Sequence, residues 1–267
     1  MIGFLIRKTF YDLWDNLFRV ALVNLGFIAS IALPIFLPAL MPSTVLSFIV
    51  LALGIFWCCV YLSAAALSLK TVSDYGGFGF KDFFVNLKFA WPAGLFMGGI
   101  IILMFLMITE IIPFYLNLSI SPLFGLFLAA LIFWTLVLGI FSLQFFFAVR
   151  ARLDRKLTKV FKKCFIIFFD NPGLAVFSLF HNLILLVLSG LLAFLIPGPA
   201  GILLFLDEAL RLRLMKYDWL EANPETEEEA QIRGRKKRII PWDAILIDER
   251  EKTGTRSFRN FIFPWKD

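Results

Sequence analysis

No charged side chain occurs anywhere over residues 20–69. A helix crosses the hydrocarbon core of a bilayer in about 20 residues, so this apolar stretch is long enough for two crossings. Pro42 and Ser43, near its middle, are typical of a turn. The stretch therefore predicts a hairpin of two transmembrane helices, over 20–40 and 46–69.

The composition of the whole chain agrees with a membrane protein. Hydrophobic residues make up 60% of the 267 residues, and charged residues make up 17%. A soluble domain carries about 25% charged residues and needs them at its surface. This composition excludes a soluble enzyme, a disulfide-rich secreted domain and a disordered chain, and it predicts an all-α polytopic membrane protein.

Three more apolar stretches predict transmembrane helices, over residues 90–109, 123–148 and 173–196. A sixth helix, interrupted by charged residues, is predicted over about 200–219, because it would return the C-terminus to the side of the N-terminus. Residues 1–19 mix aromatic and charged side chains, which is typical of an amphipathic helix at the membrane interface. The predicted fold is a bundle of about six helices.

The basic residues predict the orientation of this bundle. Residues 150–163 carry seven lysines and arginines, against Asp154 as the only acidic residue. Lysine and arginine are enriched in cytoplasmic loops, so this loop, the loop over 70–90 and both termini are predicted to be cytoplasmic. Within residues 70–90, apolar side chains from Phe78 onward have near-helical spacing, which predicts a short amphipathic helix on the inner leaflet. The net charge of +6 is thereby explained without nucleic acid.

Polar residues inside the predicted spans are candidates for function, since such groups are costly in a membrane. Asn24 and His181 could line a transport path, but a hydrogen bond to a neighbouring helix is the favoured role of each. Asp207 and Arg211 are four residues apart and are expected to meet on one face of a helix, next to Glu208. Either this group lies in a protein-lined or wet site, or the helix leaves the bilayer there.

Residues 220–267 are predicted to form a cytoplasmic tail, which follows a membrane domain over 20–219. The tail begins with an acidic linker and continues with a basic cluster and several large apolar residues. This mixture favours contact with anionic lipid headgroups or with a protein partner over RNA binding. The candidate docking residues are Arg233, Arg235, Lys236, Lys237, Arg238, Trp242, Phe258 and Trp265.

Sequence signatures of catalysis do not occur in the chain. It has one histidine and three cysteines, and it contains no GxSxG, HExxH, P-loop or dinucleotide-binding motif. We therefore expect no catalytic residue, no cofactor and no metal site.

Several short segments together resemble the YesL-like family of bacterial membrane proteins. They are Leu17 to Asn24, Leu33-Pro34, Ala64 to Leu67, Phe78 to Trp91 and Asn171-Pro172. The similarity covers about residues 5–218, rests on spacing more than on a sharp motif, and leaves the tail as an addition. It implies a multi-pass protein of the bacterial cytoplasmic (inner) membrane, in a family of unknown molecular function whose members are often encoded near carbohydrate ABC transporters.

Two functions follow as expectations. The first is a non-enzymatic accessory protein that binds a carbohydrate ABC transporter or an envelope complex through its tail. The alternative is a small transporter or channel with a polar path through Asn24, His181, Asp207 and Arg211.

Overall fold

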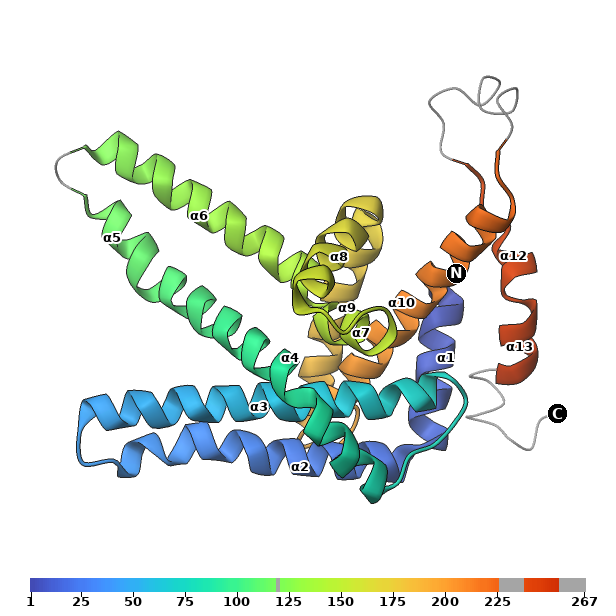
Figure 1. Ribbon diagram of the computed structural model, residues 1–267, viewed down its shortest axis with the longest axis horizontal. Helices are drawn as coiled ribbons and strands as arrows, with labels where there is room; N and C mark the ends of the chain where they lie inside the picture. The colour runs from blue at the N-terminus through green and yellow to red at the C-terminus, as the bar shows by residue number, and fades with distance from the viewer. Residues whose placement is uncertain (119–120, 226–237, 255–267) are drawn as a thin grey trace.

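The computed structural model describes residues 1–118, 121–225 and 238–254, and every regular element in these ranges is a helix (Figure 1). Five helical stretches are long and apolar enough to cross a membrane. They are Leu17–Leu40, Thr44–Ser73, Phe80–Leu116, Pro122–Arg152 and Pro172–Leu191. The all-α polytopic fold predicted from the sequence is thereby confirmed.

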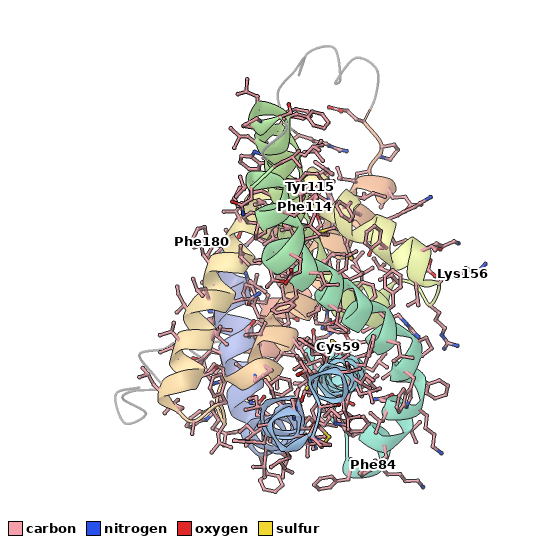
Figure 2. The ribbon with its side chains drawn as sticks, turned by 90° about the vertical axis from the view of Figure 1, so that its left-hand side faces the viewer. Cys59, Phe84, Phe114, Tyr115, Lys156 and Phe180 are labelled. Carbon is pink, nitrogen blue, oxygen red and sulfur yellow. The ribbon has the colours of Figure 1, made fainter. Side chains whose placement is uncertain are left out.

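Large apolar side chains cover the outside of these stretches. Phe84 and Phe180 point away from their helices and are 62% and 60% exposed, whereas Cys59 lies between helices (Figure 2). Apolar groups at the surface of a water-soluble protein would be costly in such numbers, but lipid chains solvate them. The described part of the chain is therefore a multi-pass membrane protein.

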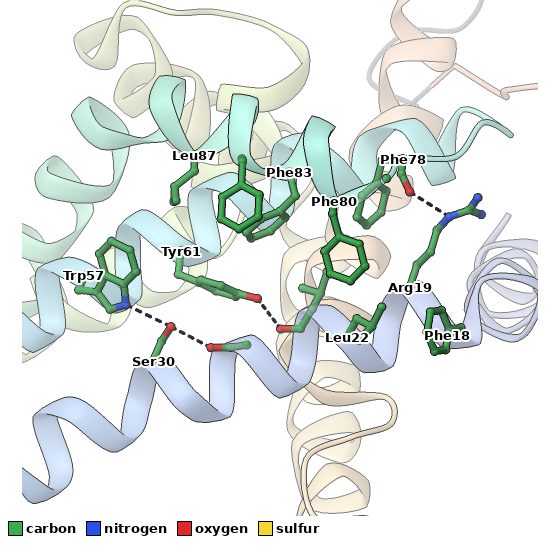
Figure 3. A pocket seen from close by; sticks show the side chains of 14 residues that line it. Phe18, Arg19, Leu22, Ser30, Trp57, Tyr61, Phe78, Phe80, Phe83 and Leu87 are labelled. Carbon is green, nitrogen blue, oxygen red and sulfur yellow. Dashed lines mark hydrogen bonds between the residues drawn. The ribbon is translucent and has the colours of Figure 1, made fainter.

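The first hairpin has its turn where the sequence predicts one. Helix α2 (Leu17–Phe36) is followed by the short helix η1 (Pro38–Leu40), and α3 (Thr44–Ser73) returns beside it. Two side chains of α3 bind α2: Tyr61 donates a hydrogen bond to the carbonyl of Val23 at 2.8 Å, and Trp57 donates one to Ser30 at 3.2 Å (Figure 3).

The second hairpin begins earlier than predicted. Helix α4 runs without a break over Phe80–Leu106 and continues through the π-helical turn η2 (Met107–Ile111) into α5 (Ile112–Leu116). The separate amphipathic helix expected within 70–90 is instead the first part of α4, because no turn residue interrupts the helix there. Helix α6 (Pro122–Leu143) returns beside α4 and α5 (Figure 1).

Helices α3 and α4 pack very closely. A Cβ atom at Gly94 would lie 2.4 Å from the Cα of Val60, so only glycine permits this approach. Small residues commonly bring transmembrane helices together in this way, because association in lipid depends on close packing.

A third pair of helices crosses the ends of these hairpins. After α7 (Phe146–Arg152) and α8 (Leu157–Asp170), helix α9 (Pro172–Leu191) leads through a turn into α10 (Gly198–Ala222), which runs antiparallel to it. The stretch predicted to span 173–196 is thus helical only to Leu191. Helix α10 confirms a helix near 200–219, but it is too polar to be among the five apolar stretches.

The N-terminal helix and the C-terminal segment both pack on α10. Leu13 and Thr9 of α1 (Ile2–Asp15) lie beside Gly201 and Glu208 respectively, so α1 runs antiparallel to α10. Helices α12 (Trp242–Ile245) and α13 (Ile247–Thr253) lie at the same end of the molecule (Figure 1). One face of α1 therefore packs into the protein core, with Leu5 fully buried, and its place at the membrane interface stays a prediction.

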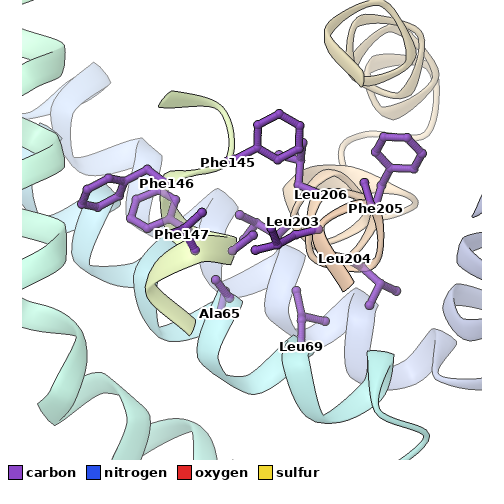
Figure 4. Packing of buried hydrophobic residues seen from close by; sticks show 14 of the residues in the cluster. Ala65, Leu69, Phe145, Phe146, Phe147, Leu203, Leu204, Phe205 and Leu206 are labelled. Carbon is purple, nitrogen blue, oxygen red and sulfur yellow. The ribbon is translucent and has the colours of Figure 1, made fainter. Parts of the chain in front are cut away.

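The apolar core lies where the helix pairs meet. Ala65 and Leu69 of α3 face Phe146 of α7 and Leu204 of α10 across this junction (Figure 4). The core therefore joins segments far apart in the sequence and fixes the positions of α3, α7 and α10 relative to one another.

Candidate functional site

A network of charged and polar side chains lies at this junction, next to the apolar core. It joins α1, the end of α3, α7, α10 and α13. The charge network consists of Lys8, Asp12, Ser73, Asp74, Tyr75, Arg152, Asp207, Glu208, Arg211 and Glu249.

The best-defined contact in the network is the pair of Arg152 and Asp207. Arg152 donates two hydrogen bonds to the carboxylate, from Nε to Oδ1 at 2.8 Å and from Nη2 to Oδ2 at 2.5 Å. Asp207 is 2% exposed. A two-point contact of this kind fixes both distance and orientation, so it sets how α7 meets α10.

The pairing predicted from sequence spacing is wrong. Asp207 was expected to meet Arg211 on one face of the helix, but it binds Arg152 from another helix. Arg211 instead contacts Asp74 at 3.3 Å and Glu249 at 2.7 Å. The reason is that both arginines contact Asp74 at the end of α3, and each has a closer carboxylate on another helix. This carboxylate is Asp207 for Arg152 and Glu249 for Arg211.

Glu208 lies on the other side of α10, against α1. Its Oε2 accepts a hydrogen bond from Thr9 at 2.5 Å, and its Oε1 lies 3.6 Å from Nζ of Lys8. Lys8 also donates to Asp12 and to the carbonyl of Ser73, the latter at 3.1 Å. Lys8 and Glu208 are each 1% exposed, so the two side chains meet in a fully buried site.

Burial raises the pKa of Glu208 well above its ordinary value, and the neighbouring Lys8 opposes this rise. Asp12 acts in the same direction as burial, because its negative charge disfavours a second one nearby. Lys8 can be neutralised by Asp12 alone. The site therefore favours a protonated Glu208.

The raised pKa predicts how Glu208→Gln changes the pH dependence of stability. Above the usual pKa of 4.5, the unfolded chain releases a proton that the folded chain retains, so folding becomes less favourable as pH rises through the folded pKa. Glutamine has no proton to release. We expect the variant to be more stable than wild type by about 1 kcal/mol at pH 8, with the difference vanishing near pH 4.

Thermal unfolding in detergent, followed by circular dichroism at several pH values, measures this difference. Glu251→Gln, at an exposed position of α13, is the matched control and should behave like wild type at every pH. A Glu208→Gln difference that is independent of pH would contradict the protonated state.

The C-terminal segment, residues 238–254, is attached to the network through Glu249. Its carboxylate accepts hydrogen bonds from Arg211 at 2.7 Å and from the hydroxyl of Tyr75 at 2.8 Å. Leu246 is fully buried beside it. This part of the predicted tail is therefore folded onto the helix bundle.

Two predicted docking residues of the tail contact α10. The guanidinium of Arg238 lies 4.6 Å from the ring centre of Trp219, and Arg213 lies 5.7 Å from that of Trp242. The other six, Arg233, Arg235, Lys236, Lys237, Phe258 and Trp265, lie outside the described residues.

Asn24 stabilises the turn between α9 and α10. Its amide nitrogen donates to the carbonyls of Leu195 and Pro197, each at 2.8 Å, and its oxygen accepts from the backbone of Ala200 at 2.9 Å. The asparagine is fully buried. All three contacts are with backbone groups, so Asn24 links α2 to the turn that precedes α10.

His181 lies apart from the charge network. Its ring stacks on Phe205 of α10, with ring centres 3.9 Å apart and planes 20° apart. Nδ1 is buried and has no hydrogen-bond partner among the described residues. The contacts of His181 are thus mainly those of an aromatic packing residue.

Lys8, Asp74 and Arg152 are members of the network that the sequence did not single out. Arg152 was counted only as one of the basic residues of a loop, and Lys8 only as part of an interfacial helix. For Asp74 and Arg152 the available signal was that each follows an apolar stretch, where charges of different helices can meet, whereas Lys8 offered no such signal.

In the part of the chain that the structure describes, no group of three histidine, cysteine or acidic side chains could hold a metal ion. Comparisons with protein-family models, with curated proteins and with solved structures found no match. The resemblance to YesL-like proteins stays a prediction.

Proposed function

We propose that the chain is a non-enzymatic accessory subunit of a membrane protein complex, and that it binds its partner through the C-terminal segment. The observation that carries this proposal is the way the segment is held. Leu246 and Glu249 anchor it to the bundle, while Ile239 and Ile247 are 90% and 53% exposed. A fixed surface with exposed apolar side chains is suited to binding a protein.

The contacts of the polar residues support a structural role over a transport path. Asn24 binds a backbone turn, His181 stacks on Phe205, and Asp207 and Arg211 bind charged partners from other helices. Side chains that line a transport path must release their protein partners to bind the substrate, whereas the contacts of these side chains hold helices together.

The partner class and the location come from the sequence resemblance. A YesL-like protein would lie in the bacterial cytoplasmic membrane, and a carbohydrate ABC transporter or an envelope complex would be its partner. We include both in the proposal.

Co-purification of the full chain, expressed at its native level and extracted in mild detergent, tests the proposal. We expect a stoichiometric membrane-protein partner in the wild-type sample. Ile247→Asp should reduce the amount of partner about tenfold, because a charge would replace an apolar contact at the interface. Glu251→Gln, on the same short helix, should leave the amount unchanged.

Two results would contradict the proposal. One is a chain that elutes alone or only with copies of itself. The other is substrate flux by the purified chain in liposomes that changes on Asp207→Asn, which would instead support the small transporter or channel.

A further inference from the structure

A groove between α2, α3 and α4 is large enough for a ligand. Its cavity volume is about 540 Å³, which is within the usual range of ligand sites. Most of its lining side chains are apolar, among them Leu22, Phe83 and Leu87 (Figure 3). The groove is distinct from the charge network and from the C-terminal segment.

The groove opens toward the lipid. Its three helices all belong to the apolar stretches that can cross a membrane. Phe18, Phe80 and Phe84 line it and are 72%, 66% and 62% exposed. An occupant would therefore enter from the bilayer, past aromatic side chains that contact lipid.

One end of the groove carries a fixed positive charge. Arg19 donates from Nε to the carbonyl of Phe78 at 3.0 Å and from Nη1 to Asn16 at 2.6 Å. A Cβ at Gly77 would lie 2.8 Å from Nη2 of Arg19, so glycine leaves room for the guanidinium. Nη2 has no hydrogen-bond partner among the described residues, and Arg19 is solvent-exposed.

Asp82 is an acidic residue near this end that does not neutralise Arg19. Asp82 accepts a hydrogen bond from the backbone nitrogen of Gly79 at 2.8 Å, at the start of α4. No ion pair joins it to Arg19 within the described residues. The free donors of Arg19 are therefore available to an anion.

The other end of the groove is apolar and deep. Ser30 and Trp57 line it there, and they bind each other at 3.2 Å. Arg19 and Ser30 are separated by eleven residues of α2, which is about 16 Å at 1.5 Å per residue. Tyr61 turns its hydroxyl to Val23, so its ring presents carbon to the groove.

We propose that the groove binds one anionic phospholipid. The phosphate contacts Arg19, and one acyl chain lies along α2 toward Trp57. The combination of a fixed guanidinium at the membrane surface and an apolar channel of this length matches a charged headgroup followed by a hydrocarbon chain. A transmembrane helix of a partner would not use the charge at the end of the groove.

Native mass spectrometry of the full chain tests this, with phosphatidylglycerol and phosphatidylcholine supplied at equal concentration. Wild type should retain one phosphatidylglycerol in preference to phosphatidylcholine. Arg19→Gln should remove the preference, about a tenfold loss, because the guanidinium no longer attracts the net negative charge that phosphatidylglycerol carries and zwitterionic phosphatidylcholine lacks. Leu87→Trp, which fills the groove, should lower retention of both lipids.

Lys88→Gln is the matched control, since Lys88 is exposed on α4 and does not line the groove. It should retain lipid like wild type. Arg19→Lys keeps the charge and should preserve part of the preference. The thermal unfolding midpoint of Arg19→Gln shows whether that variant is folded.

The proposal is overturned if wild type retains both lipids equally, or if the preference survives Arg19→Gln. It is also overturned if Leu87→Trp leaves lipid retention unchanged, or if that variant instead dissociates a dimer, which would assign the groove to a second copy of the chain.

Discussion

Replacing Asp207 with leucine is expected to lower the thermal unfolding midpoint of the full chain by about 10 °C, equivalent to about 3 kcal/mol. The loss arises because Arg152 would keep its buried position without its two-point partner. Asp74, which lies 3.0 Å from Arg152, compensates for only part of the lost interaction. Circular dichroism in detergent, at one fixed heating rate, measures the shift.

The double variant Arg152→Met/Asp207→Leu distinguishes the cost of leaving Arg152 unpaired from the loss of the ion pair itself. Removing both charges leaves no buried charge without a partner, since Asp74 keeps Arg211 at 3.3 Å, and well-packed apolar residues often replace such pairs at little cost. We expect it to recover most of the lost stability. A double variant as unstable as Asp207→Leu would show that the ion pair itself stabilises the fold, and that the loss is not caused by an unpaired arginine.

The second large effect is expected for Asn24→Ala. This change removes two donors and one acceptor from a buried backbone turn, and it leaves the carbonyl of Leu195 and the N–H of Ala200 without partners, while the carbonyl of Pro197 still accepts from Gly201. Unpaired buried groups cost about 1–3 kcal/mol each, so we expect a loss of about 4 kcal/mol. Thermal unfolding of the full chain again measures it.

Asn117→Ala is the matched control for Asn24. The amide of Asn117 donates only to the carbonyl of Pro113, one turn back in the same helix, at an exposed site. Its loss should change stability by less than about 0.5 kcal/mol. Similar effects at the two positions would argue against a special role of Asn24.

The sequence predicts the positions of most helices in this protein, but it predicts few of the contacts between them. The charge-free stretch over 20–69 predicts the first hairpin, because bilayer thickness fixes the length of a span. The start of α4 was missed, since amphipathic spacing does not distinguish a separate helix from the first turns of a longer one. Where α4 begins is set locally, by the contact of Asp82 with Gly79.

Several residues of the candidate site could be predicted from the sequence, but the residues that they bind could be predicted only in part. A buried carboxylate needs a cation, and spacing along α10 offered Arg211 to Asp207. The actual partner, Arg152, is 55 positions away and is brought there by the packing of α7 on α10. Contacts between distant helices depend on tertiary structure, and the residue pattern of one helix cannot predict them.

The position of α10 has a consequence for the order in which the protein can be completed during synthesis. Lys8 and Arg152 emerge from the ribosome before their partners Glu208 and Asp207 exist. Chains fold from the N-terminus as they are made, so Lys8 can pair with Asp12 and Arg152 with Asp74 first, and the contacts with α10 form only after it has been synthesised. The helix that is too polar to be an obvious span is thus the one that joins α1, α3, α7 and α9, all of which precede it in the chain.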